Sequence, residues 1–303
     1  MTTRDSLLAA LVATVWGFNF VVIDWGMGDV PPLVLVAVRF AAVLVPAVFL
    51  VPRPQAHWRT VAGVGLFMSL GQFGLLYTSM HAGLPPGIAA LVLQAQVLFT
   101  VLIAAAWIGE RPTGLQLVGI GVGAAGLVVV GVGRGGHVPL SALLLCVAAA
   151  LSWAVGNVIS RRAGVRAGLS MAAWSSLVVP VPLLALSLLL DGPTAVAEGF
   201  RAFDGAAALS TLYTAGLASL VGYSLFNGLL ARYPASSVTP FVLIAPPVAM
   251  ASAWLLLDQS PNLAEGAGAV VVLGGVLLTV HAGRRASAAG AAAAAAAAIP
   301  ARA

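Results

Sequence analysis

The sequence predicts an all-α integral membrane protein, in which ten transmembrane helices form two inverted five-helix repeats around a central cavity. Composition, ten apolar runs of bilayer length and the similarity of the two halves predict this fold. Of the 303 residues, 61% are hydrophobic and 8% are charged, and the mean hydropathy is +1.05. A soluble domain has about 25% charged residues, so this composition cannot form a water-exposed surface. Continuous apolar runs favour membrane helices over a β-barrel, whose strands alternate polar and apolar residues.

The expected spans are separated by clusters of glycine, proline and charged residues, and each approaches the roughly 20 residues that a bilayer requires. Neighbouring spans are expected to be antiparallel because their connections are short. The longest connection, residues 191–205, is expected to be a loop. The ten expected spans are 7–27, 33–51, 60–80, 87–108, 114–133, 140–160, 169–190, 206–230, 236–257 and 264–283.

The distribution of arginine predicts the orientation of the chain. With a cytoplasmic N-terminus, the inner segments hold eleven arginines and the outer loops hold two, Arg134 and Arg201, while Arg39 lies within a span. Cytoplasmic segments of membrane proteins carry the excess of basic residues. We therefore expect a multi-pass protein of the bacterial inner membrane with both termini in the cytoplasm. The net charge of +5 does not indicate a nucleic-acid partner, because the charges are scattered over short loops.

The two halves of the chain resemble each other at a shift of 149 residues. Residues 1–137 are expected to form the first five-helix repeat and residues 138–285 the second, while the alanine-rich segment 286–303 is expected to be disordered. Because five is odd, the second repeat would enter the membrane from the opposite side, as in many transporters. The alternative is a chance alignment of apolar segments rich in glycine and proline. The superposed pairs are Pro85 and Pro234, Pro112 and Pro261, Gly119 and Gly268, and Gly126 and Gly275.

Several motifs resemble a known family. The stretch "WGFNF" at 16–20, Arg39 in the second span and "WIGERPTGLQLVGIGVGAAGLVVV" at 107–130 are similar to the drug/metabolite transporter superfamily, EamA branch, over residues 7–283. Within that branch the chain looks like the YddG-type aromatic amino-acid exporters. The second half departs from the pattern, with Gln259 at the position equivalent to Glu110. Relatives that carry phosphate esters would be expected to use lysine, and this chain has none.

Asp24 and Arg39 are the two ionisable residues within spans, and such residues are functional candidates. They lie at similar depth on neighbouring antiparallel spans. We expect them to form an ion pair or to flank the outer vestibule. The alternative is that Arg39 extends outward to the interface or caps backbone carbonyls.

Neutral polar and aromatic side chains within the spans are the candidates for contact with a substrate. Tyr213, Tyr223 and Asn227 follow one stripe of the eighth span, which is too polar to face lipid. Such groups can orient an amino acid by hydrogen bonds, and rings can stack on its side chain. The alternative is hydrogen bonding between helices. The candidate substrate-binding residues are Trp16, Asn19, Gln72, Tyr77, Gln94, Trp153, Asn157, Tyr213, Tyr223, Asn227 and Pro246.

Pro246 and Pro247 stand together within the ninth span. Proline breaks a helix interior, and non-helical backbone at membrane depth is tolerated where it lines a cavity or is buried in protein. We expect the pair to open the backbone onto a cavity formed by spans three, four, eight and nine with spans one and six. A static kink that only suits packing is the alternative.

The family resemblance and the span pattern together predict a secondary transporter that exports aromatic or neutral amino acids and related small metabolites by alternating access. A multidrug or other metabolite permease of the same fold is the alternative. No carboxylate lies at mid-membrane, which predicts weak or no obligatory proton coupling. An intramembrane enzyme or a passive channel is less favoured, because no span centre holds a histidine base and no charged ring is present.

The same sequence indicates which partners to expect. The histidines show no metal-ligand spacing and no phosphate-binding loop motif is present, so we expect no metal and no cofactor. The partners expected are a small-molecule substrate and the lipid bilayer. Gly119 and Gly123 form a small-residue packing face, which favours packing within one chain over a dimer. A monomer or a weak homodimer is therefore predicted.

Overall fold

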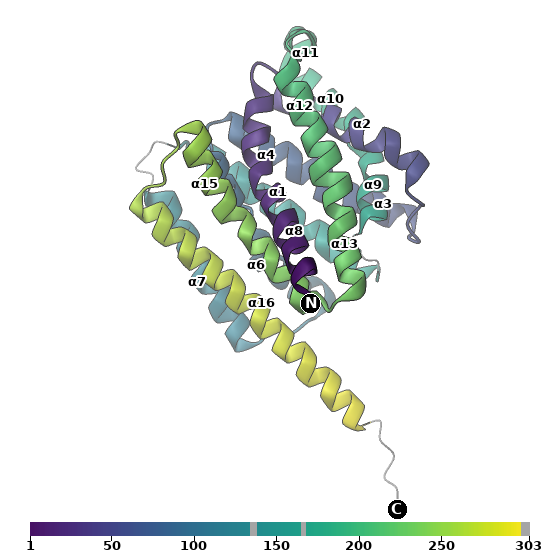
Figure 1. Cartoon of the computed structure of the whole chain (residues 1–303), viewed down its shortest axis with the longest axis vertical. Coiled ribbons are helices and arrows are strands. Elements are labelled where there is room, and N and C mark those ends of the chain that lie inside the picture. Colours follow the sequence, from purple (N-terminus) through teal and green to yellow (C-terminus); the bar gives the residue numbers. More distant parts are fainter. Residues whose placement is uncertain (134–137, 165–167, 298–303) are drawn as a thin grey trace, which may run out of the picture.

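In the computed structural model, which describes residues 1–133, 138–164 and 168–297, the described chain is a bundle of helices (Figure 1). Nine helical segments are long and apolar enough to cross a membrane, and a bent helix pair supplies a tenth span. The expectation of ten membrane helices is confirmed. The spans are Thr3–Met27 (α1), Pro32–Leu50 (α2), Trp58–His81, Pro86–Ile108, Gly114–Gly133 (α7), Leu140–Arg162 (α8), Leu169–Leu190, Gly205–Arg232, Thr239–Leu257 and Leu263–Ala286, the last being part of α16 (Leu263–Ala297).

The third and eighth spans each contain a π-helical segment, in which the backbone turn is wider than in an α-helix. In the third span, η1 (Gly65–Gly71) lies between α3 (Trp58–Val64) and α4 (Gln72–His81). In the eighth, η3 (Tyr213–Val221) lies between α12 (Gly205–Leu212) and α13 (Gly222–Arg232). Segments of this kind often occur at functional sites.

The fourth and ninth spans are interrupted near their middle. The fourth breaks at Leu93–Gln94, between α5 (Pro86–Val92) and α6 (Ala95–Ile108). The ninth passes from a short α14 (Ala235–Val238) through the 3-10 segment η4 (Thr239–Ile244) into α15 (Ala245–Leu257).

The proline pair begins a helix and does not interrupt one, which corrects the expectation from sequence. α15 starts at Ala245, so Pro246 and Pro247 occupy its first turn. Amide groups in the first turn have no partner within a helix, and proline therefore causes no loss there. The irregular backbone lies before the pair, in η4. Pro246 is buried and Pro247 is exposed.

Two other segments differ from the expectation. The seventh span bends by 42° between the segment Leu169–Val178 and α10 (Pro180–Leu190); the first part consists of α9 (Leu169–Ser175) and η2 (Ser176–Val178). The connection expected as a loop contains α11 (Gly192–Arg201), which buries Val196 and Gly199 and exposes its other side.

The alanine-rich tail is helical as far as the structure describes it. α16 continues past Arg285 to Ala297 and projects from the bundle in Figure 1, so disorder is contradicted for residues 286–297. Alanine has the highest helix propensity, and a helix that is already formed extends through it readily. Residues 298–303 lie outside the described part of the chain.

Backbone features recur at the shift of 149 residues. Gly109 ends α6 with φ 75° and Asp258 ends α15 with φ 54°. The helices that follow, α7 and α16, begin with the same pair of reciprocal hydrogen bonds, a capping box. Thr113 and Gln116 form the first box, and Asn262 and Glu265 form the second.

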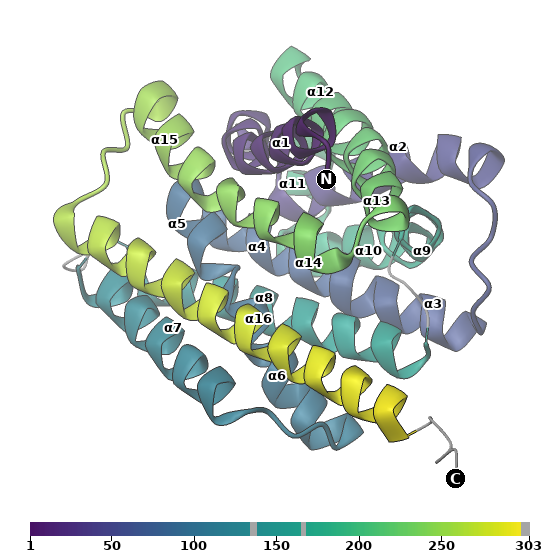
Figure 2. The same ribbon diagram turned by 60° about the horizontal axis from the view of Figure 1, so that its bottom comes forward.

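α7 and α16 lie side by side at one edge of the molecule (Figures 1 and 2). They approach each other through glycines: a Cβ at Gly126 would lie 3.0 Å from the Gly268 carbonyl oxygen, and one at Gly275 would lie 2.7 Å from the Gly119 carbonyl oxygen. Backbones this close require residues without side chains. The glycine-rich face predicted from sequence is therefore used within one chain.

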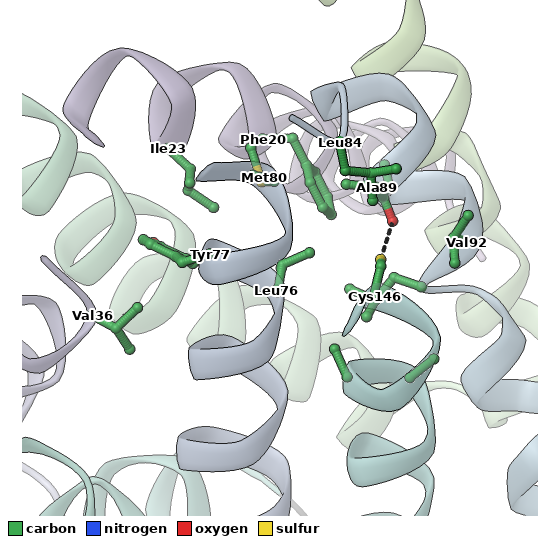
Figure 3. Packing of buried hydrophobic residues seen from close by; sticks show 14 of the residues in the cluster. Phe20, Ile23, Val36, Leu76, Tyr77, Met80, Leu84, Ala89, Val92 and Cys146 are labelled. Atoms are coloured by element: carbon green, nitrogen blue, oxygen red, sulfur yellow. Dashed lines mark hydrogen bonds between the residues drawn. The ribbon is translucent and has the colours of Figure 1, made fainter. Parts of the chain in front are cut away.

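The largest buried cluster includes residues of α1, α2, α4, α5 and α8, in the first, second, third, fourth and sixth spans (Figure 3). Cys146, the one cysteine in the sequence, is a fully buried free thiol, and its sulfur donates to the Ala89 carbonyl oxygen at 3.6 Å. Phe20 and Tyr77 also belong to this cluster.

Candidate functional site

A pocket lies between the second, third, seventh and eighth spans. It encloses about 550 Å³ of space that protein atoms leave empty, including the part open to its surroundings. We call it the Arg39 pocket. Its lining residues are Arg39, Phe40 and Val43 of α2; Val64, Met68, Ser69, Gln72 and Phe73 of the third span; Met171, Ala172, Ser175 and Ser176 of the seventh; and Ser219 and Tyr223 of the eighth.

These spans differ from the set predicted to form the cavity, which shares only the third and eighth. Spans one and nine pack tightly near the break of the ninth, where a Cβ on Gly17 would lie 2.7 Å from the Cβ of Val248. Spans four and six are joined by the Asn157 amide, which donates to the Gln96 side-chain oxygen at 2.9 Å. The side chains at those breaks are therefore engaged in contacts between helices.

Arg39 is buried, with 4% of its surface exposed. One terminal nitrogen donates to the Tyr77 hydroxyl at 3.2 Å and the other to Ser219 Oγ at 3.3 Å. The guanidinium carbon lies 4.1 Å from the centre of the Phe73 ring, a distance typical of a cation–π contact. The Nε atom is buried and has no hydrogen-bond partner among the described residues.

The predicted ion pair between Asp24 and Arg39 is wrong. All nine Asp and Glu residues fall in the described ranges, and no ion pair found there includes Arg39. Asp24 is only half-buried, whereas Arg39 is turned into the bundle by its contacts with Tyr77, Ser219 and Phe73. A buried cation without a counter-ion is unfavourable in a protein interior, so the site favours an anionic group from outside the chain.

The π-helical turn of η3 places Ser219 beside Arg39. Ser219 Oγ donates to the Thr214 carbonyl oxygen, five residues back, at 2.7 Å and accepts from Arg39. The hydroxyl therefore uses a carbonyl of the widened turn as its own acceptor. On the other wall, Ser69 belongs to η1 and Gln72 is the first residue after it.

The first span is fastened to the eighth by side chains that were predicted to bind substrate. Trp16 Nε1 donates to the Ala218 carbonyl oxygen in η3 at 2.9 Å, and the Tyr213 hydroxyl donates to the Val15 carbonyl oxygen at 2.9 Å. The Trp16 ring centre lies 5.4 Å from that of Tyr223. Trp16 thus supports the pocket from behind Tyr223.

The structure brings three of the eleven predicted residues to this site. Gln72 and Tyr223 line the pocket, and Tyr77 contacts Arg39. The others lie elsewhere: Trp16 and Tyr213 join spans one and eight, Asn157 joins spans four and six, Trp153 packs on the main core, and Asn19, Gln94, Asn227 and Pro246 are buried or half-buried outside the lining.

Sequence reasoning did not select Phe73, Ser175, Ser176 and Ser219. Serines within an apolar run are a weak signal, because most satisfy a carbonyl of their own helix. Ser175 and Ser176 do this, each donating to the Ala172 carbonyl oxygen, at 3.1 Å and 2.8 Å. Both nevertheless line the pocket, just before the bend of the seventh span.

A helical membrane fold that holds one fixed charge and several neutral polar groups in a buried pocket is suited to recognising a solute, and it defines a membrane transport protein. The chain belongs to the EamA-like transporter family, whose model matches residues 4–132 and again residues 140–281. The resemblance to the EamA branch is confirmed, and the protein is a transporter rather than an enzyme.

Known relatives agree with this assignment. The chain is 39% identical to a "Probable amino-acid metabolite efflux pump" of Escherichia coli strain K12, over 92% of this chain and 96% of the relative. It is 28% identical to a "Probable terminal-alkyne amino-acid exporter" of Streptantibioticus cattleyicolor, over 75% of each chain. A solved crystal structure with 23% identity has a TM-score of 0.61, covering 94% of this chain and 99% of that one, and is similar in fold.

Proposed function

We propose that this protein exports amino acids with aromatic or other neutral side chains, and related small metabolites, across the bacterial inner membrane by alternating access. The names of the relatives in Escherichia coli and Streptantibioticus cattleyicolor support a cargo of this class. The bilayer is its other partner, and a monomer or weak homodimer is the proposed working form.

The uncompensated charge of Arg39 carries the proposal. Its two terminal nitrogens are oriented by Tyr77 and Ser219, and its flat face rests on Phe73. A planar guanidinium suits a carboxylate. A carboxylate that enters the pocket would supply the counter-ion that the described chain lacks there, so the cargo's acid group would bind at Arg39.

The apolar wall of the pocket suits the side chain of such a cargo. Phe40, Phe73 and Tyr223 present aromatic rings, and Met68 and Met171 present flexible thioethers. Aromatic and methionine side chains accommodate planar and apolar groups of different shapes. A cationic drug would instead meet the like charge of Arg39, which disfavours the alternative of a multidrug permease for cations.

Alternating access would come from two inverted halves, residues 1–137 and 138–285. The double match of the family model and the recurrence of backbone features at a shift of 149 residues support this division. The bias of arginine to one side supports cytoplasmic termini. Arg39 is the one charged residue in the lining of the pocket, which supports transport without obligatory proton coupling; uphill accumulation of cargo driven by a pH gradient alone would contradict it.

The test is counterflow of labelled L-phenylalanine into liposomes that contain the purified protein. We expect saturable uptake that unlabelled neutral amino acids inhibit, and a loss of about 10-fold or more in apparent affinity in Arg39→Gln, because a charge-assisted hydrogen-bonded contact is removed. Arg59→Gln, at the exposed first turn of α3, is the matched control. Equal affinity in wild type and Arg39→Gln would refute the role of Arg39.

A further inference from the structure

Two buried polar side chains on the wall of the Arg39 pocket have no hydrogen-bond partner among the residues that the structure describes. Ser69 is 7% exposed and Gln72 is 4% exposed, and neither belongs to the described residues whose side chains hold a fully buried polar atom without a partner. Both residues line the pocket, so their polar atoms stay accessible from it. These groups are therefore available to a ligand.

Ser69 and Gln72 lie near further oxygen atoms. Both side chains line the pocket, Ser69 from η1 and Gln72 from the first position of α4. η1 packs closely on the seventh span, because a Cβ at Gly65 would lie within 3.2 Å of the backbone of Ser175. The hydroxyls of Ser175 and Ser176 both donate to the Ala172 carbonyl oxygen. Their oxygen atoms can therefore still accept a hydrogen bond from a ligand.

Arg39 contacts the same wall of the pocket, the one formed by the third span. Its guanidinium lies on the ring of Phe73, the residue after Gln72. The pocket lining thus has a cationic end at Arg39 and neutral oxygens along η1 and the seventh span, and no carboxylate is among its lining residues. An ammonium group needs acceptors only, and neutral oxygens serve this purpose without removing the charge of Arg39.

We propose that Gln72 Oε1, together with the hydroxyl oxygens of Ser69, Ser175 and Ser176, forms a subsite for the α-ammonium group of the cargo. This inference rests on the proposed function and sharpens it: the cargo is bound as a zwitterion, with its carboxylate at Arg39 and its ammonium at Gln72. Cations that lack a carboxylate are rejected, because they meet the charge of Arg39 without compensating it.

The experiment compares equilibrium binding of three probes to the full chain in detergent. L-Phenylalanine has both charged groups, N-acetyl-L-phenylalanine lacks the ammonium, and L-phenylalaninamide lacks the carboxylate. In Gln72→Leu we expect binding of L-phenylalanine to weaken about 10-fold and binding of the N-acetyl compound to stay at the wild-type level. In Arg39→Gln both carboxylates should bind at least 10-fold more weakly.

Ser69→Ala is a milder second variant, for which we expect the same pattern with a smaller loss. Ser224→Ala is its control, because that exposed hydroxyl donates to the Leu220 carbonyl of its own helix. Unchanged L-phenylalanine binding in Gln72→Leu, or equal weakening for L-phenylalanine and its N-acetyl derivative, would overturn the ammonium subsite alone. If the wild-type protein binds none of the three probes, the proposed function itself fails.

Discussion

The Arg39 guanidinium donates to the Tyr77 hydroxyl at 3.2 Å across the space between the second and third spans. The Tyr77 ring is 1% exposed and belongs to the main apolar cluster (Figure 3). Tyr77 therefore packs in the apolar cluster through its ring and contacts Arg39 through its hydroxyl. The acceptor is held by packing, so the cation is oriented before any ligand arrives, which favours binding.

Tyr77→Phe removes this acceptor and keeps the ring. We expect the affinity for a carboxylate cargo to fall several-fold because Arg39 loses one of its two oriented nitrogens. Counterflow of L-phenylalanine measures the change. Tyr233→Phe is the matched control, since its hydroxyl donates to Asp5 at 2.6 Å near the end of α13, away from the pocket. Equal affinities in both variants would show that Tyr77 does not orient Arg39.

Ser152→Ala tests how the π-helical segment of the third span is stabilised. Ser152 Oγ, on α8, donates to the Phe67 carbonyl oxygen in η1 at 2.8 Å. Removing the hydroxyl leaves that carbonyl without this donor, so we expect the free energy of unfolding in detergent to fall by about 1 kcal/mol. Ser224→Ala provides the comparison; a loss of the same size there would mean that the contact between spans contributes nothing of its own.

The close contact of α7 and α16 predicts opposite effects at adjacent glycines. A Cβ at Gly275 would lie 2.6 Å from the Cα of Gly123, whereas a Cβ at Gly274 meets no atom within 4 Å. We expect Gly275→Ala to lower the free energy of unfolding by about 1–3 kcal/mol through overpacking. Gly274→Ala should raise it by up to about 1 kcal/mol through helix propensity. Thermal unfolding of both variants measures these changes. Two changes of the same sign would refute the packing argument.

The two left-handed helix ends predict which substitutions each position tolerates. Asp258 is the only residue other than glycine with positive φ in the described chain, and Gly109 is its counterpart. Asn adopts this conformation, but β-branched residues do not. We expect Asp258→Asn and Gly109→Asn to fold normally, and Asp258→Val and Gly109→Val to lose about 1–2 kcal/mol. Chemical unfolding curves that are alike for Asn and Val would contradict this assignment.

Most of the fold was predictable because membrane spans obey a constraint on composition. A segment such as Gly114–Gly133 must be apolar over its whole length, and charged or proline-containing connections end it. The errors lie where several conformations are compatible with apolar sequence. Neither the bend before Pro180 nor the start of α15 at Ala245 follows from hydropathy, since both depend on which neighbouring helix is packed against the break.

The site was less predictable than the fold. Gln72, Tyr77 and Tyr223 were selected because polar groups in spans need partners, but the same reason selects contacts between helices such as Asn157 with Gln96. Sequence cannot tell these two uses apart, because each requires only a polar residue within a span. The missed serines of the seventh span illustrate the converse, since their hydroxyls satisfy their own helix and still reach the pocket.

The amino-acid sequence by itself determined that this chain lies in a membrane and how many times it crosses, because lipid excludes charge along every segment independently of its neighbours. Only the tertiary structure decided the partner of Arg39. The sequence offered Asp24, the interface or backbone carbonyls, whereas the folded chain supplies the hydroxyls of Tyr77 and Ser219. Side-chain packing between the spans makes this choice, and it leaves the cation facing a pocket with no carboxylate among its described lining residues.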